Sequence, residues 1–425
     1  MKVNFSQVLF ALSFSLDCVE KEVLGVTTNH GKRVAYIAVK LADSQHLPPE
    51  ARMDLAACAI MHDNALAESV KTELGLSKMS AGNQDGAGSD FKTMLTIHCR
   101  LGEQNLTDFP FHTDCRKVIL YHHENYDGSG CFGLKGEQTP YLSQLVHLAD
   151  QLDLACALGV DRPNLYVQVM DYLEEERGKA FAPELVDRFG QVFTAEQMQR
   201  ILDVNIDASL HQLLPTQCSE YTIEQLIAVA RVFATIVDHK SSFTMRHSLG
   251  IAEKAEIMGR YYHFSQEKVE KLYVAGALHD IGKLAISTDV LEKPGKLTQE
   301  EFVHMKNHAY YSYKILSPIR GLEDITHWAS YHHEKLDGSG YPFGKTAADL
   351  DHEDRLLACL DIYQALTEAR PYKKPYSHAK AMGIMQGMVK RNLIDGAIFA
   401  DLEKVFGAKV SVQSQPGVTY LLNCK

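Results

Sequence analysis

Tyr121-His-His-Glu-Asn-Tyr-Asp-Gly-Ser-Gly130 and Tyr331-His-His-Glu-Lys-Leu-Asp-Gly-Ser-Gly340 are two copies of one unusual string within a single chain. Self-similarity between distant segments is the sequence signature of a repeated structural unit. The string therefore predicts that one fold is built twice. Because Asp and Gly favour turns, we also expect a tight turn after each His doublet.

Histidine and aspartate residues recur at matching intervals around both strings. A His-Asp pair lies upstream of each string, and a single His precedes each pair by 32 residues. A further His stands 24 residues before each doublet, and an Asp follows the doublet's second His by 27 or 28 residues. The first copy contains His30, His62, Asp63, His98, His122, His123 and Asp150, and the second contains His247, His279, Asp280, His308, His332, His333 and Asp361. The duplication therefore covers nearly the whole chain.

The segments between these residues follow a helical pattern. In 220–237 and 248–262, apolar residues stand three and four positions apart with polar residues between them, which indicates amphipathic helices. Each copy closes with an amphipathic stretch, 181–193 and 393–406, and weak strand-like alternation is confined to 409–413 and 418–422. Pro215 interrupts the helical pattern. We therefore expect an all-α fold of two tandem helical domains, 1–217 and 218–425.

Composition and charge narrow the functional classes. The formal net charge of −11 over 425 residues argues against a carrier of long nucleic acids, which needs many cationic side chains on the phosphates. The apolar stretch 8–16 is broken by serine and followed by acidic residues, so it is neither a signal peptide nor a membrane span. Nine cysteines without a Cys-x-x-Cys pair fit neither a disulfide framework nor a thiolate zinc site. We expect a reduced, cytoplasmic protein with no membrane segment.

The repeated residues are of the types that bind metal ions without sulfur. Imidazole and carboxylate groups suit iron, manganese and zinc, and seven of them are too many for one ion. They suit two ions bridged by a carboxylate, with open positions for water and substrate. Neighbouring helical residues point about 100° apart, so His332 and His333 can face different ions while Asp280 lies between them. Two ions roughly 3.5–4 Å apart suit phosphodiester chemistry.

These residues carry a family resemblance. The second copy, over roughly 236–401, resembles the HD-GYP phosphodiesterases, a branch of the HD metal-dependent phosphohydrolase superfamily. The resemblance rests on His279-Asp-Ile-Gly-Lys283, His332-His-Glu334, Asp337-Gly-Ser-Gly-Tyr-Pro342 and Arg370-Pro-Tyr-Lys373, together with the spaced His247, His308 and Asp361. It implies a five-helix HD core that holds two or three ions and hydrolyses cyclic dinucleotides. The tandem arrangement is similar to that of bacterial 3′,3′-cyclic GMP-AMP phosphodiesterases.

The resemblance also implies roles for single residues. The seven His and Asp residues of the second copy would be the metal ligands, and His279, Asp280 and Lys283 would be catalytic. Lys283, Tyr341, Arg370 and Lys373 would contact the substrate. Members with three ions carry a Glu four residues before the first His, where this chain has Phe243. We therefore expect two divalent ions, with iron or manganese favoured over nickel, magnesium or zinc.

The first copy departs from the family pattern. It keeps all seven ligand types, but it has Asn64-Ala65-Leu66 after the His-Asp pair and Gly130-Cys131-Phe132 in place of Gly-Tyr-Pro. We expect this degenerate copy to bind metal through the second ligand set, from His30 to Asp150, while lacking the substrate contacts.

Three functions are compatible with these observations. The first is hydrolysis of 3′,3′-cyclic GMP-AMP, cyclic di-GMP or both to linear 5′-phosphorylated dinucleotides. The second is an HD nucleotidase that acts on mononucleotides, and the third is a non-catalytic receptor or scaffold. The intact ligand set of the second copy favours the enzyme, because a pure binding protein has little need of two hydrolytic metals. No oligomeric state is selected, and a homodimer is compatible with the sequence.

Overall fold

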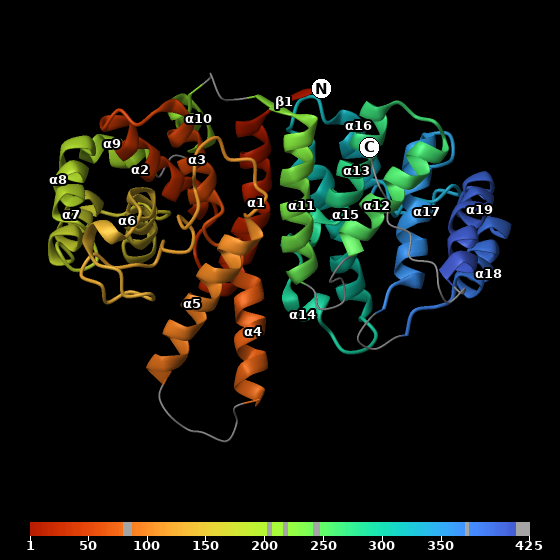
Figure 1. Ribbon diagram of the computed structural model, residues 1–425, viewed down its shortest axis with the longest axis horizontal. Coiled ribbons are helices and arrows are strands. Elements are labelled where there is room, and N and C mark those ends of the chain that lie inside the picture. Colours follow the sequence, from red (N-terminus) through yellow and green to blue (C-terminus); the bar gives the residue numbers. More distant parts are fainter. Residues whose placement is uncertain (80–86, 202–205, 216–219, 241–246, 370–373, 414–425) are drawn as a thin grey trace.

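Helices form both halves of the molecule (Figure 1). The structure is a computed structural model that describes residues 1–79, 87–201, 206–215, 220–240, 247–369 and 374–413. The expected all-α fold is confirmed, since a single two-stranded sheet is the only sheet in these ranges. Within the same ranges, no helix has the length and apolar character needed to cross a membrane.

Ten α-helices lie in the first half of the described chain. They are α1 (Phe5–Leu24), α2 (His30–Ser44), α3 (Pro49–Ile60), α4 (Leu66–Met79), α5 (Ala87–Asn105), α6 (Tyr141–Ala155), α7 (Leu165–Glu175), α8 (Pro183–Val192), α9 (Ala195–Ile201) and α10 (Ile206–Leu213), with a 3₁₀ turn, η1, at Gly136–Gln138.

The second half repeats this plan with its own helices. They are α11 (Ile223–Lys240), α12 (His247–Tyr261), α13 (Gln266–Leu278), α14 (Thr288–Leu291), α15 (Gln299–Leu316), α16 (Glu323–Ser330), α17 (His352–Thr367), α18 (His378–Lys390) and α19 (Gly396–Gln413), with a 3₁₀ turn, η3, at Ile281–Ala285.

Side-chain caps fix where several helices of the second half begin. Thr298 and Glu301 form a reciprocal capping box at the start of α15, and Asp351 and Asp354 form another at the start of α17. Ser265 caps α13 by accepting from the backbone N–H of Lys268. A cap of this kind is worth about 1 kcal/mol because it satisfies an otherwise unpaired N–H at the helix start. These caps fix the starts of the helices that carry or precede His279, His308 and Asp361.

The short sheet ties the beginning of the chain to the beginning of the second half. β1 (Lys2–Asn4) pairs antiparallel with β2 (Glu220–Thr222), and the Phe5 ring stacks on the Tyr221 ring with centroids 4.1 Å apart. The strand-like alternation at 409–413 does not form a strand, because α19 packs on α18 and continues as a helix through Gln413. The stretch 418–422 lies outside the described residues.

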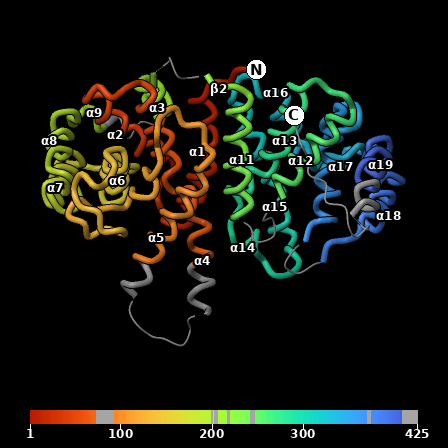
Figure 2. Tube along the Cα trace, viewed as in Figure 1, coloured from red at the N-terminus to blue at the C-terminus, as the bar shows by residue number. Residues whose placement is uncertain are grey.

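The two halves pack against each other along α1 and α11 (Figure 2). Helix α1 contacts η3 and α15 of the second half, while α11 contacts α4 and α5 of the first. One hydrophobic cluster runs through both halves, so the junction is part of the core. The expected boundary at 217/218 falls beside residues 216–219, which lie outside the described ranges, and it stays a prediction.

Candidate metal centres

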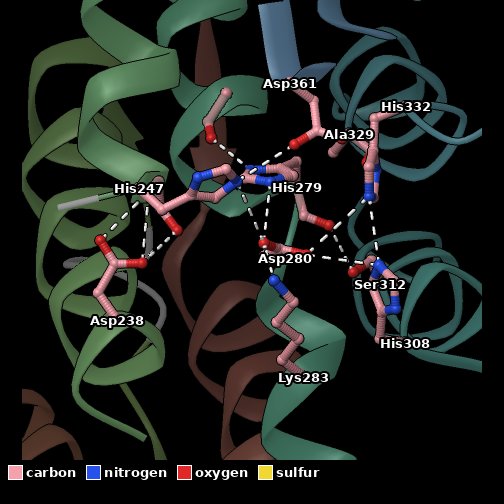
Figure 3. Close-up of polar contacts among 12 residues, drawn as sticks. Asp238, His247, His279, Asp280, Lys283, His308, Ser312, Ala329, His332 and Asp361 are labelled. Atoms are coloured by element: carbon pink, nitrogen blue, oxygen red, sulfur yellow. Dashed lines mark hydrogen bonds and ion pairs between the residues drawn. The ribbon is translucent and has the colours of Figure 1, made fainter. Parts of the chain in front are cut away.

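The second half brings its seven predicted ligands together, and Figure 3 labels all of them except His333. His247 begins α12, His279 follows α13, and Asp280 precedes η3. His308 lies on α15, the His332-His333 doublet follows α16, and Asp361 lies on α17. Helix packing therefore brings together residues that are up to 114 positions apart in sequence.

The two oxygens of Asp280 face different histidines. Asp280 Oδ2 lies 3.0 Å from His279 Nε2 and 3.8 Å from His247 Nε2. Asp280 Oδ1 lies 3.4 Å from His308 Nε2 and 3.9 Å from His332 Nε2. The donor atoms form two groups compatible with a metal ion, one of His247, His279 and Asp280 and one of His308, His332 and His333.

Asp361 lies between the same two groups on the opposite side. Its Oδ1 is 3.2 Å from His247 Nε2, and its Oδ2 is 3.5 Å from His333 Nδ1. Two carboxylates thus each reach both histidine groups. The sequence predicted one bridging carboxylate, Asp280, for a pair of ions, and the number of ions stays a prediction.

Backbone carbonyls orient three of the imidazoles. The Nδ1–H of His279, His308 and His332 can donate to the carbonyls of Gly276, Met305 and Ala329 at 2.8, 2.6 and 2.6 Å, respectively. A carbonyl can only accept, so each Nδ1 carries the proton and each Nε2 presents a lone pair. His279 Nε2 is buried and, with its lone pair, faces Asp280 Oδ2 at 3.0 Å. A nitrogen lone pair and a carboxylate oxygen at this distance repel each other, and a cation between them would offset that repulsion.

Burial and local charge set the protonation states around Asp280. Burial disfavours its charged form, yet His279 and Lys283 hold its pKa well below the usual range. Burial lowers the pKa of His333 to about 3 despite the opposing effect of Asp361. Ionised carboxylates and neutral imidazoles are the forms that bind metal. The donor set therefore fits divalent cations.

His247 differs from the other histidines of this centre because its pKa is raised. Burial opposes its protonation, but hydrogen bonds to Asp361 and Glu368 raise its pKa to about 9. Its Nδ1 lies 2.9 Å from Glu368 Oε2. In the metal-free protein His247 is thus protonated at neutral pH, and a cation bound by its Nε2 would displace a proton. Glu368 was not identified from the sequence, which gave no spacing signal for it.

The predicted substrate residues are described only in part. Lys283 Nζ lies 2.5 Å from Asp280 Oδ2, so it sits at the centre. The Tyr341 ring lies 4.7 Å from the His333 ring, and Lys306 Nζ lies 5.2 Å from the Tyr341 ring centroid. Arg370 and Lys373 lie outside the described residues. Lys306 was missed because a lone lysine carries no signal in sequence.

The repeated string forms a tight loop around its glutamate. Glu334 accepts backbone N–H bonds from Phe343 and Lys345 at 2.7 and 2.9 Å. A Cβ on Gly340 would lie 2.5 Å from Glu334 Cα, so only glycine fits there. Asp337 Oδ1 accepts from the N–H of Ser339, which closes the expected turn. The sequence repeats this glutamate but gave no reason for it, and the structure supplies one.

The first half assembles its seven predicted residues in the same way. Asp63 Oδ1 lies 3.0 Å from His98 Nε2, and Asp63 Oδ2 lies 3.6 Å from His62 Nε2. Asp150 Oδ1 lies 3.3 Å from His30 Nε2 and 3.4 Å from His62 Nε2. The donors again form two groups, one of Asp63, His98, His122 and His123 and one of His30, His62 and Asp150.

The loop of the first half is also preserved. Glu124 accepts from the N–H groups of Phe132 and Leu134 at 2.5 and 2.7 Å. Leu66 stands three residues after Asp63, where the second half has Lys283 after Asp280, and Cys131 follows Gly130. The first half thus keeps the donor atoms and the loop, while the local substrate cation is absent from position 66.

Comparisons with known proteins agree with this duplicated arrangement. Residues 21–185 and 231–398 each match the family model described as HD domain. The chain is 30% identical over 406 residues to 3′3′-cGAMP-specific phosphodiesterase 1 of Vibrio cholerae, covering 93% of this chain and 90% of that one. It is 31% identical over 218 residues to the cyclic di-GMP phosphodiesterase response regulator RpfG of Xanthomonas campestris, covering 49% of this chain and 57% of that one.

A solved structure shares the fold over almost the full length. The crystal structure of V-cGAP3, a cyclic GMP-AMP-specific phosphodiesterase of V. cholerae, superposes with a TM-score of 0.66 at 22% identity, covering 96% of this chain and 98% of that one. Both halves carry the His-Asp cluster on helices and in the turns between them, and both match the same family model. The chain therefore belongs to the HD domain family, with the domain present twice.

Proposed function

We propose that this protein is a metal-dependent phosphodiesterase that opens cyclic dinucleotides at the centre of its second half. The observation that carries the proposal is the position of Asp280, whose two oxygens face two separate histidine groups. The substrates proposed are 3′,3′-cyclic GMP-AMP and cyclic di-GMP, by analogy with the activities for which the relatives are named. The product is a linear 5′-phosphorylated dinucleotide.

Two divalent cations are proposed for this centre. Its donors are imidazole nitrogens and carboxylate oxygens, which suit iron and manganese, while nickel, magnesium and zinc are the alternatives for metal analysis. When bound, such a pair would supply a hydroxide nucleophile near neutral pH and stabilise the attacking and leaving oxygens of the phosphoryl group. The carbonyl-bound imidazoles and the ionised Asp280 hold the donor atoms in place without further rearrangement.

The chain's own cations and aromatic groups would position the phosphate. The Lys283 ammonium, 2.5 Å from Asp280 Oδ2, is close enough to the centre to neutralise a phosphate oxygen. Burial raises the pKa of Tyr341, so its hydroxyl stays protonated and can donate a hydrogen bond, and its ring can stack on a base. Arg370 and Lys373 are proposed as further phosphate or base contacts on the resemblance alone.

Two other functions are tested by the same experiment. An HD nucleotidase would release phosphate from mononucleotides and leave cyclic dinucleotides intact. A receptor would bind a cyclic dinucleotide without changing its mass. The seven-residue donor set with two-sided carboxylates favours turnover over simple binding.

The deciding experiment combines metal analysis with product identification. Protein purified anaerobically is assayed for bound metal and then incubated with 3′,3′-cyclic GMP-AMP, cyclic di-GMP, GMP and AMP in ¹⁸O-labelled water. Mass spectrometry should show linear dinucleotides that contain one solvent oxygen on the 5′-phosphate. If neither dinucleotide is linearised with iron or manganese present while mononucleotides lose phosphate, the nucleotidase function replaces this proposal.

A further inference from the structure

A cavity of about 430 Å³ opens over the metal cluster of the first half. Its volume falls in the lower part of the range of about 300–1,000 Å³ that small-molecule sites occupy. Asp63, His98, His123 and Asp150 line it together with side chains from α1, α4, α5 and α6. The cluster of the first half is therefore accessible to a small ligand and is not closed off by packing.

Buried histidine nitrogens lie in the cluster that this cavity adjoins, and one of these histidines, His98, lines the cavity itself. His122 Nε2 and His98 Nδ1 have no hydrogen-bond partner among the described residues. His98 Nε2 lies 3.0 Å from Asp63 Oδ1, and His62 Nε2 lies 3.4 Å from Asp150 Oδ1. All three histidines belong to the two donor groups of the first half. Cations bridged by Asp63 would satisfy them, as proposed for Asp280 in the second half.

A lysine reaches the cavity from α5, whereas the lysine at the second-half centre, Lys283, lies in η3. Lys92, six residues before His98 on α5, lines the cavity, and its Nζ donates to the carbonyl of Ser129 at 3.3 Å. It has no carboxylate partner among the described residues, so its charge is available to an anion. The corresponding position in the second half, six residues before His308, is Phe302. The lysine therefore stands at a different matched position in each half. Leu66 of the first half corresponds to Lys283 of the second, and Lys92 of the first half corresponds to Phe302 of the second.

Polar and apolar side chains share the remaining lining. Asn125, Ser129, His147 and Gln151 offer polar groups, and Leu24, Leu66, Met94, Leu95 and Leu154 are apolar. A bare inorganic anion would leave these side chains facing water, whereas a flat, weakly polar group would cover them. A fitting ligand would place an anionic group at Lys92 and the cations and cover the apolar side chains with the rest of its surface. A phosphate ester of nucleoside size meets both requirements.

We infer that the first half contains a second, metal-dependent binding site for a nucleoside phosphate, in which Lys92 supplies the cation that position 66 lacks. Nothing in the inference requires turnover in the second half. The site lies between the metal donors and the wall that α1 contributes through Leu24. Phosphate binding by cations from separate elements needs only their convergence in space.

The test is equilibrium dialysis of labelled GMP against the full-length, Mn²⁺-loaded protein. All variants carry Lys283→Met, which weakens binding at the second half and leaves its metal donors intact. GMP should bind at one site, and Lys92→Met should raise its Kd at least tenfold. Lys179→Met changes an exposed lysine of the same half, outside the cavity lining, and should leave the Kd within twofold.

Guanosine and inorganic phosphate test separately the two parts of GMP, its nucleoside and its phosphate. Each should bind at least tenfold more weakly than GMP, and removal of Mn²⁺ should abolish GMP binding. Lys92 is exposed, so its substitution should leave the thermal midpoint unchanged. Equal GMP affinity with and without Lys92, equal affinity for phosphate and GMP, or no GMP binding at all would each overturn the inference. None of these results depends on whether the wild type cleaves cyclic dinucleotides, so the proposed function is tested separately.

Discussion

Asp280 is the residue on which both proposed cations depend, since each of its oxygens faces a different histidine group. Asp280→Ala should lose bound metal and lower kcat by more than a hundredfold, because even loss of a residue that only supports a metal ligand costs about 10–100-fold. Metal content, turnover and helicity are measured together. Asp324→Ala, which removes an exposed carboxylate paired with Lys271, is the control. Wild-type turnover in Asp280→Ala would contradict the assignment.

Glu20 is a buried acid beside the first-half centre. Neither of its carboxylate oxygens has a hydrogen-bond partner among the described residues. Burial raises its pKa to about 8, and the nearby His30 opposes this shift. The sequence pattern gave no reason to single it out, because Glu20 lies outside the repeated intervals.

The raised pKa of Glu20 makes stability depend on pH. The metal-free folded protein holds this proton more tightly than the unfolded chain does. Stability is therefore fully present below the unfolded pKa of Glu, near 4.5, and falls as the pH rises towards about 8. Glu20→Gln should be more stable than the wild type at pH 8 by at least about 1 kcal/mol, since one pKa unit is worth about 1.4 kcal/mol.

Chemical denaturation at pH 5 and pH 8, with and without Mn²⁺, measures this effect. The advantage of Glu20→Gln should shrink at pH 5, where the carboxyl is protonated in the folded protein. It should also shrink with Mn²⁺, because cations at the first-half centre favour the charged carboxylate. An advantage that is the same at both pH values would contradict the assigned pKa.

At the scale of elements, α1 connects the first half to the segment that carries Lys283. Glu22 Oε1 accepts from the N–H of Thr288 at 2.7 Å, and Glu22 Oε2 lies 3.0 Å from Lys240 Nζ. Lys240 is buried and also donates to the carbonyl of Leu284 at 2.7 Å. A polar network therefore links α1, α11, η3 and the start of α14.

Glu22→Gln should destabilise the molecule by about 3 kcal/mol, because it leaves the buried Lys240 charge without its carboxylate. Urea denaturation followed by circular dichroism measures the change. Glu256→Gln breaks an exposed pair with Arg260 on α12 and should change stability by less than about 0.5 kcal/mol. Equal effects of the two substitutions would show that Lys240 finds another partner when Glu22 is neutral.

At the scale of the whole molecule, the two halves differ in the residues that would position a substrate. The first half keeps seven donors but has Leu66 and Cys131 where the second half has Lys283 and Tyr341. Attack on a phosphodiester needs the phosphate positioned and its charge offset, in addition to the cations. We therefore expect the first half to bind metal and contribute little cyclic dinucleotide turnover.

Asp63→Ala and Asp280→Ala form the matched pair that tests this division. Each should lose the metal of its own half, but only Asp280→Ala should lose turnover. Some loss of thermal stability is expected in both, because metal binding and folding are coupled. If Asp63→Ala is folded and as inactive as Asp280→Ala, the first half is required for catalysis and the division of work is wrong.

The sequence alone predicted the all-α fold and the duplication, and it identified the fourteen residues that the structure brings together in two clusters, whose role as metal ligands stays a prediction. It could do so because intervals between ligands reflect helix lengths and connections, and these repeat when a fold repeats. The string around Glu124 and Glu334 was visible for the same reason. Only its physical basis, a glutamate that binds the backbone of its own loop, required coordinates.

The tertiary structure determined which residues far apart in the chain are in contact. Only helix packing placed the two oxygens of Asp280 between histidine groups, brought Lys92 to the cavity of the first half, and buried Glu20 beside a centre formed mostly by other helices. Such contacts join residues far apart in sequence, and their geometry depends on the angles and distances at which helices pack. No local pattern records those angles, so spacing identified the donors and packing determined how they are arranged.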